Sequence, residues 1–114
     1  MTPEPSRGEI WLADLDPIRG HEQAGRRPVL ILSTNGLNHG PADLVIAAPL
    51  TSTARRIPYR VQLDPPEGGL RNTSYVLCDA VRSIAKERLL TRWGMVSPEA
   101  LAQVADYLRI LLEL

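Results

Sequence analysis

The apolar residues of this chain fall into short runs separated by prolines, glycines and polar residues. Runs of this length, bounded by turn-forming residues, are typical of β-strands. Residues 29–33 and 44–48 are nearly continuous aliphatic runs, which indicates strands buried on both faces. Residues 59–63 alternate between apolar and polar side chains, as a half-exposed strand does. The strands that we predict cover residues 9–13, 29–33, 44–48, 59–63, 74–78 and 91–96.

The pattern changes to a helical period after residue 96. Ser97, Pro98 and Glu99 are typical of a helix start, as cap, first helical residue and first-turn acid. The apolar residues that follow form one stripe at helical spacing: Leu101, Val104, Ala105, Leu108, Leu111 and Leu112. Leu112 and Leu114 would either offer apolar surface to a partner or pack on the chain's own sheet.

Residues 1–6 carry two prolines and are predicted to be a flexible tail. Residues 34–41 have the composition of a loop with room for one helical turn, and residues 83–90 fit a short helix. Five or six short strands followed by one long helix predict a small, mainly β barrel. We expect a single domain over residues 1–114.

Composition adds bounds on location and chemistry. Of the 114 residues, 44% are hydrophobic and 23% are charged, as in ordinary globular proteins. No apolar run approaches the ~18 residues of a membrane span, and the N-terminus lacks an apolar signal segment, so we expect a cytoplasmic protein without a membrane partner. Cys78 is the single cysteine, which excludes an intramolecular disulfide and a cysteine-rich metal site.

The formal net charge is zero, but the basic residues are unevenly distributed. Lys86 is the only lysine among the 13 basic residues, a bias that a GC-rich genome would also produce. Their positions are more informative, because five arginines cluster in the first half of the chain, which is compatible with nucleic-acid binding. These are Arg26, Arg27, Arg55, Arg56 and Arg60.

The segment from Gly20 to Ser33 combines a polar loop with a buried strand. Residues 20–27 hold an imidazole, a carboxylate, an amide and two guanidinium groups between two glycines. Because Pro28 pushes the preceding residue into an extended conformation, we expect Arg27 to stand at the mouth of the strand. On this segment alone, a ligand-binding loop and a merely solvated loop fit equally.

Three blocks of the sequence, in order, resemble the signatures of the MazF/PemK/Kid toxin family. The first is residues 20–32 (GHEQAGRRPVLIL), preceded by residues 7–11 (RGEIW). The second is residues 48–53 (APLTST), and the third is residues 69–82 (GLRNTSYVLCDAVR). Together they span nearly the whole chain.

The resemblance implies a MazF/CcdB-like fold, an SH3-like small β-barrel with a C-terminal α-helix, assembled as a homodimer. It implies the toxin of a bacterial toxin–antitoxin pair: a metal-independent, sequence-selective endoribonuclease that cuts single-stranded RNA and leaves 2′,3′-cyclic phosphate and 5′-hydroxyl ends. No metal or other cofactor is expected. The implied partners are mRNA and a MazE-like antitoxin whose acidic segment occupies the RNA groove.

Residue by residue, Arg27 and Thr51 match the active-site arginine and threonine of the family. Asp79 matches a proposed general base, and His21 and Glu22 match the histidine and glutamate of the first block. Arg27 should stabilise charge, because a guanidinium stays protonated at working pH. The residues that we expect to bind RNA are Gln23, Arg26, Ser52, Thr53, Arg55, Arg56 and Arg82.

The chain departs from the family pattern at Leu77, where Kid-like members carry an arginine proposed as the acid. Strand alternation places Leu77 on the same face as Asp79, where it cannot exchange a proton. We therefore hypothesise that Asp79 and His21 divide the proton transfers while Arg27 holds the phosphate charge. Ala80 and Ala85 replace a common glutamine and aspartate, which affects RNA preference more than activity.

Two alternatives remain at this point. One is a CcdB-like gyrase poison, but that group ends in Trp-Gly-Ile, whereas this chain ends in Leu112-Glu113-Leu114. The other is a family member that binds RNA or antitoxin without cutting.

Overall fold

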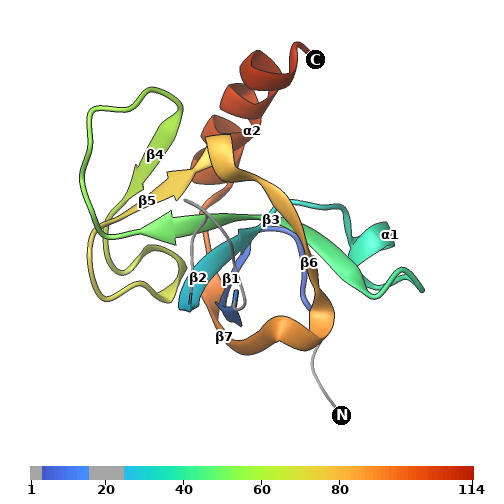
Figure 1. Cartoon of the computed structure of the whole chain (residues 1–114). Coiled ribbons are helices and arrows are strands. Elements are labelled where there is room, and N and C mark those ends of the chain that lie inside the picture. The colour runs from blue at the N-terminus through green and yellow to red at the C-terminus, as the bar shows by residue number, and fades with distance from the viewer. Residues whose placement is uncertain (1–3, 16–24) are drawn as a thin grey trace.

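The computed structural model describes residues 4–15 and 25–114 (Figure 1). Its strands are β1 (Glu9–Asp14), β2 (Arg26–Ile31), β3 (Leu44–Thr51), β4 (Arg60–Leu63), β5 (Ser74–Leu77), β6 (Arg82–Ala85) and β7 (Leu89–Met95). Its α-helices are α1 (Asn35–Asn38) and α2 (Pro98–Leu112), and its 3₁₀ turns are η1 (Glu67–Gly69), η2 (Cys78–Ala80) and η3 (Lys86–Arg88). None of the described helices has the length and apolar character needed to cross a membrane.

The strands form one antiparallel sheet in the order β4-β5-β3-β2-β1-β7, with β6 added to β3. The first half of β3 pairs with β6 and its second half with β5, so the sheet branches at β3 (Figure 1). The expected mainly β fold with a C-terminal helix is confirmed. A closed barrel is too strict a description, because no pairing within residues 4–15 and 25–114 joins β4 to β7.

The strand β2 is buried on both faces, as its aliphatic run predicts. Val29, Leu30 and Ile31 have no exposed surface. Leu30 packs in a core cluster with residues such as Leu50, while Val29 and Ile31 pack in a second cluster on the opposite face with residues such as Ile84. The polar residues at the start of β2 are therefore held by a rigid, well-packed strand.

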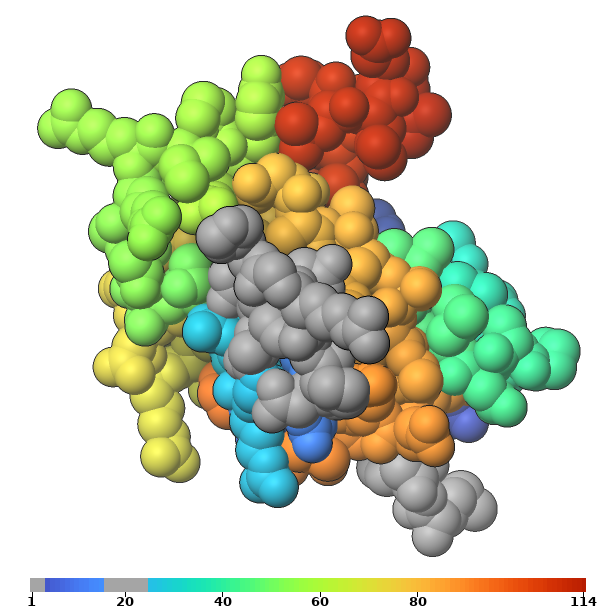
Figure 2. All heavy atoms as spheres, in the orientation of Figure 1, coloured from blue at the N-terminus to red at the C-terminus, as the bar shows by residue number. Residues whose placement is uncertain are grey.

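The helix α2 begins and packs as its sequence indicates. The Ser97 hydroxyl accepts the N–H of Ala100 at 3.2 Å, and Val104 is fully buried against the sheet. The stripe is covered only over its first turns, because Leu111 and Leu112 are 36% and 56% exposed. The end of the helix projects from the body of the molecule (Figure 2).

Two segments differ in part from what their sequence predicts. Residues 83–90 begin as a strand, because Ile84 pairs with Val45 of β3 and is buried there, and the short helix within this segment is the 3₁₀ turn η3. Of the predicted tail, residues 1–3 lie outside the described residues, while residues 4–6 contact the body of the chain, since Lys86 Nζ lies 3.1 Å from Glu4 Oε2 and the N–H of Ser6 binds Glu9 Oε1 at 2.6 Å.

Candidate active site

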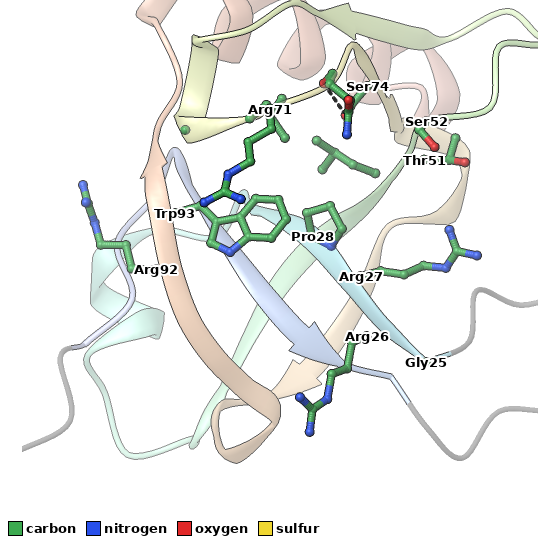
Figure 3. Close-up of a pocket in the computed structure, with 14 residues that line it drawn as sticks. Gly25, Arg26, Arg27, Pro28, Thr51, Ser52, Arg71, Ser74, Arg92 and Trp93 are labelled. Atoms are coloured by element: carbon green, nitrogen blue, oxygen red, sulfur yellow. Dashed lines mark hydrogen bonds between the residues drawn. The ribbon is translucent and has the colours of Figure 1, made fainter.

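A groove of about 890 Å³ lies where four segments far apart in the sequence converge (Figure 3). It is bounded by the start of β2, the end of β3, the segment between η1 and β5, and the middle of β7. The residues that line it are Gly25, Arg26, Arg27, Pro28, Leu50, Thr51, Ser52, Gly69, Leu70, Arg71, Asn72, Ser74, Arg92 and Trp93.

Arg27 and Thr51 line the groove from two neighbouring strands. The pairing of β2 with β3 ends where Val29 lies opposite Pro49; Arg27 precedes this point on β2, Thr51 follows it on β3, and both line the groove. Arg27 also pairs with Ala13 of β1. The arginine is thus held in an extended strand directly before the buried run, as Pro28 predicts.

Thr51 is the last residue of β3, and a short turn fixes its hydroxyl group. The Thr51 Oγ1 atom accepts the backbone N–H of Thr53 at 3.2 Å. This N–H is therefore engaged within the chain. With its oxygen accepting from Thr53, the hydroxyl of Thr51 has its hydrogen left to donate toward the groove.

The wall opposite these strands is built from two backbones in close contact. A side-chain Cβ at Gly69 would lie 2.2 Å from the carbonyl oxygen of Trp93, and one at Gly94 would lie 2.7 Å from the carbonyl carbon of Gly68. Gly69 also adopts a left-handed conformation, with φ of 75°. Glycine is thus required where η1 meets β7, and this contact fixes the position of Trp93.

The groove is cationic although the chain as a whole is neutral. Four arginines line it, and none of its described lining residues is acidic. Arg92 is paired outside the groove with the buried Glu9 of β1. Burial acts to raise the pKa of Glu9, but hydrogen bonds from Arg92, Ser6 and Trp11 outweigh it and hold the pKa below its ordinary value.

Known proteins share this fold and sequence pattern. The family model of the PemK-like, MazF-like toxins of type II toxin–antitoxin systems matches residues 6–112. This chain belongs to that family.

Characterised relatives of this MazF-like toxin cover it almost completely. It is 37% identical to endoribonuclease MazF9 of Mycobacterium tuberculosis over 113 residues, which cover 95% of this chain and 96% of that protein. Crystalline MazF of Deinococcus radiodurans superposes with a TM-score of 0.87 at 32% identity, covering 99% of this chain and 100% of that one. A mycobacterial endoribonuclease solved in complex with its cognate antitoxin gives a TM-score of 0.81 at 32% identity, with 96% of each chain covered.

Asp79 does not lie where strand alternation would place it. The strand β5 ends at Leu77, and η2 then turns the chain, so Leu77 is 2% exposed while the Asp79 side chain is 40% exposed. The expectation that the two residues share a face is therefore wrong. Asp79 is not among the lining residues of the groove, and its Oδ1 atom lies 3.5 Å from Arg60 Nε.

The Asp79–Arg60 contact is a charge pair rather than an aligned hydrogen bond. Arg60 Nε is buried and has no hydrogen-bond partner within the described part of the chain, although the carboxylate lies within ion-pair distance. Next to Asp79 in η2, Cys78 is a buried core residue. Burial and the neighbouring charge of Asp79 raise the pKa of its thiol to about 11, so the thiol stays protonated and unreactive.

The other predicted site residues are dispersed. Arg26 lines the groove, but its side chain points away from Pro28 (Figure 3). Arg55 and Arg56 are exposed on the segment between β3 and β4, and Arg82 begins β6 and donates to the carbonyl oxygen of Ser83 at 3.4 Å. Ser52 lines the groove beside Thr51. His21, Glu22 and Gln23 lie outside the described residues.

Sequence reasoning missed the far wall of the groove. Arg71 and Asn72 lie within the third sequence block, yet only the turn that brings them against β7 makes them lining residues. Trp93 belongs to none of the three sequence blocks, and the adjacent Gly94 is the one sequence feature that could have indicated its position at the groove. Within the described ranges, no three His, Cys, Asp or Glu side chains are grouped to hold a metal ion.

Proposed function

We propose that this chain is a toxin that cuts single-stranded mRNA as a sequence-selective endoribonuclease. The observation that carries the proposal is that Arg27 and Thr51 line the same groove, which is lined by four arginines and by no described acidic residue. Its relatives named endoribonucleases support the same activity. The whole chain acts as one toxin domain, in the cytoplasm, where mRNA is found.

The reaction uses a nucleophile that the substrate supplies. The 2′-hydroxyl of RNA attacks the adjacent phosphorus, the bond to the 5′-oxygen breaks, and the products carry a 2′,3′-cyclic phosphate and a 5′-hydroxyl. The enzyme must remove one proton, deliver another to the leaving oxygen, and stabilise the phosphorane between these steps. No step calls for a metal ion.

Arg27 and Thr51 have the properties that phosphorane stabilisation requires. The guanidinium of Arg27 remains charged at any working pH and offers several N–H donors to phosphate oxygens. The hydroxyl of Thr51 is held by the N–H of Thr53 and donates its hydrogen to a phosphate oxygen. Donors fixed before the substrate arrives stabilise developing charge without reorganisation.

The proton transfers are assigned to His21, Asp79 and Glu22. Histidine is the side chain whose unperturbed charge change falls between pH 5 and 8, so His21 is suited to move a proton. Asp79 acts as the base if substrate binding draws it from its contact with Arg60. Glu22 is the alternative partner to His21.

RNA and the antitoxin compete for the same cationic surface. The residues proposed to contact RNA are Gln23, Arg26, Ser52, Thr53, Arg55, Arg56 and Arg82. A MazE-like antitoxin with an acidic segment complements the arginines, and a mycobacterial relative was solved with its cognate antitoxin. A second copy of the chain forms the toxin dimer.

Sequencing the ends of RNA cut by the purified protein tests this function. Total RNA is incubated with the protein and with the Arg27→Ala variant, and molecules with 5′-hydroxyl ends are ligated and sequenced. The proposal requires one short sequence to be enriched at the cut sites of the wild type and absent with the variant. Binding of RNA without any new ends would instead identify a non-cleaving member of the family.

A further inference from the structure

Trp93 is a tryptophan that the fold places on the groove instead of in the core. Its side chain is 38% exposed, and Figure 3 shows the indole directed across the groove toward Pro28. The other tryptophan, Trp11, is 3% exposed, and its Nε1–H binds the carboxylate of Glu9 at 3.2 Å. Only one of the two tryptophans therefore presents its ring to a ligand.

The ring is presented by a rigid backbone. The carbonyl group of Trp93 lies against Gly69, and Gly94 lies against Gly68, so closely that no side chain fits between them. The pairing of β7 with β1 holds the same stretch from the other side, with Arg92 opposite Trp11. An aromatic side chain on a fixed backbone loses little conformational freedom when it binds a ligand.

Arg71 adds a positive charge to the same end of the groove. It follows the glycine turn that contacts Trp93, and its side chain extends from the η1–β5 segment toward β7 (Figure 3). An exposed aromatic face beside a guanidinium group is the combination that binds unpaired nucleotides, because the base stacks on the ring and the cation holds the backbone. A carboxylate-rich peptide would use the cation but would gain nothing from the flat indole.

We propose that Trp93 stacks against one unpaired base of the bound RNA while Arg71 contacts the neighbouring phosphate. The proposal rests on the RNA-cleaving function above and adds to it a nucleotide site on the wall opposite Arg27 and Thr51. Stacking accepts any base, so this site sets affinity and the position of the strand rather than the identity of the base.

The experiment measures binding separately from cleavage. The wild type and its variants are titrated with a 2′-O-methyl oligonucleotide of the cleaved sequence, or with oligo-dT if no cleaved sequence is found. Tryptophan fluorescence and fluorescence anisotropy of a labelled oligonucleotide are both recorded. The Leu90→Ala variant, at an exposed apolar position of β7 that does not line the groove, is the control.

In the wild type, binding should change the fluorescence of Trp93, with Trp11 as a constant background. Trp93→Phe should lose this change yet bind with nearly the affinity of the wild type, because phenylalanine also stacks. Trp93→Ala and Trp93→Leu should bind roughly 5- to 150-fold more weakly, the range expected for loss of one base–aromatic stack. Arg71→Gln should reduce the slope of log affinity against log salt by about 0.7.

The stacking proposal is overturned if Trp93→Ala binds like the wild type, or if Trp93→Leu binds as tightly as Trp93→Phe, since apolar bulk would then suffice. These outcomes are distinct from failure of the proposed function. If the wild type cuts RNA and Trp93→Ala binds normally, the ribonuclease function stands and the stacking site is rejected. If the wild type cuts no RNA but Trp93→Ala binds oligo-dT more weakly, the ribonuclease function is rejected and the stacking site stands.

Discussion

At the residue scale, the proposed chemistry depends on Arg27, which a local sequence rule places correctly. The proline after it and the aliphatic run that follows predict an arginine at the mouth of a buried strand, and β2 has this form. Thr51 could be named as a site residue from the sequence only by resemblance. The fold supplies the physical reason, because it brings the start of β2 and the end of β3 to the same groove.

Arg27→Ala should lower the rate of RNA cleavage about 10²–10³-fold, equivalent to ~2.7–4 kcal/mol of lost transition-state stabilisation, as for other oxyanion donors. Its unfolding midpoint should stay close to that of the wild type, because the buried core of β2 begins only at Val29. Single-turnover cleavage and thermal unfolding measure the two quantities. Arg109→Ala, on the exposed face of α2, is the matched control and should cleave normally. Near-normal cleavage by Arg27→Ala would place this arginine outside the site.

His21 carries the second residue-scale prediction. If it exchanges a proton during the reaction, single-turnover cleavage has a pH limb near the ordinary pKa of histidine, ~6.5. His21→Ala should abolish that limb and slow the reaction, whereas His39→Ala should leave both unchanged. An unaltered pH profile in His21→Ala would transfer the role to Glu22 or to Arg27.

The prediction from strand alternation is wrong at Asp79 for an identifiable reason. A period of two holds only while the chain remains a strand, and β5 ends at Leu77. The next three residues form η2, which keeps Cys78 in the core and turns Asp79 outward. No glycine or proline marks this turn in the sequence, so residue patterns alone could not locate the end of the strand.

At the scale of elements, the groove depends on the contact between η1 and β7. Gly94→Ala should destabilise the protein by about 1–3 kcal/mol, because the added methyl carbon would lie 2.7 Å from the backbone of Gly68. Urea unfolding measures the loss. The matched control is Gly36→Ala in α1, where the nearest atom, Thr34 Oγ1, is 3.8 Å away and the change should stay within about 0.5 kcal/mol. Equal stability of the two variants would contradict the close contact.

The strands β1 and β7 are joined by the carboxylate of Glu9. Glu9→Gln should lower stability at neutral pH by about 1.5–3 kcal/mol, because it weakens hydrogen bonds to a charged group that is 7% exposed. The folded-state pKa of Glu9 is lowered, so this contribution is present above its ordinary pKa of 4.5 and is lost as the pH falls through the lower folded value.

Urea unfolding at pH 7 and at pH 3 separates the charge of Glu9 from its shape. The difference between the wild type and Glu9→Gln should be large at pH 7 and smaller at pH 3. A difference that is equal at both values would mean that shape, and not ionisation, holds the two strands together.

For some elements, the pattern of residues in the sequence is sufficient to predict the structure. The double burial of residues 29–31 and the start of α2 follow directly from composition and capping residues. The segment from Arg82 to Ala85 does not, because its short Ile-Ala pattern fits a helix or a strand equally. The segment forms a strand because the first half of β3 pairs with it.

At the scale of the whole molecule, the chain has a formal net charge of zero, but the fold forms a groove lined by arginines. The arginines at positions 26, 27, 71 and 92 come from segments on both sides of the chain's midpoint, and the fold brings these segments around one groove, although Arg92 is paired with Glu9 outside it. Composition therefore could not predict the groove, although the resemblance to RNA-cleaving toxins predicted its ligand. A surface of this kind binds any single-stranded nucleic acid, so binding alone does not establish the reaction.

The reaction is tested by removing the nucleophile from the substrate. An RNA oligonucleotide with a single 2′-O-methyl group at the cut position should bind with nearly unchanged affinity but remain intact, because the methyl group blocks the attacking oxygen. Unmodified RNA should be cut equally in buffer with magnesium and in buffer with EDTA, since the proposed steps use only Arg27, Thr51 and their neighbours. Gel analysis of end-labelled substrates measures both. Cleavage of the methylated RNA would show that the nucleophile is water or a protein group, and activity lost in EDTA and restored by a divalent cation would show that a metal ion takes part.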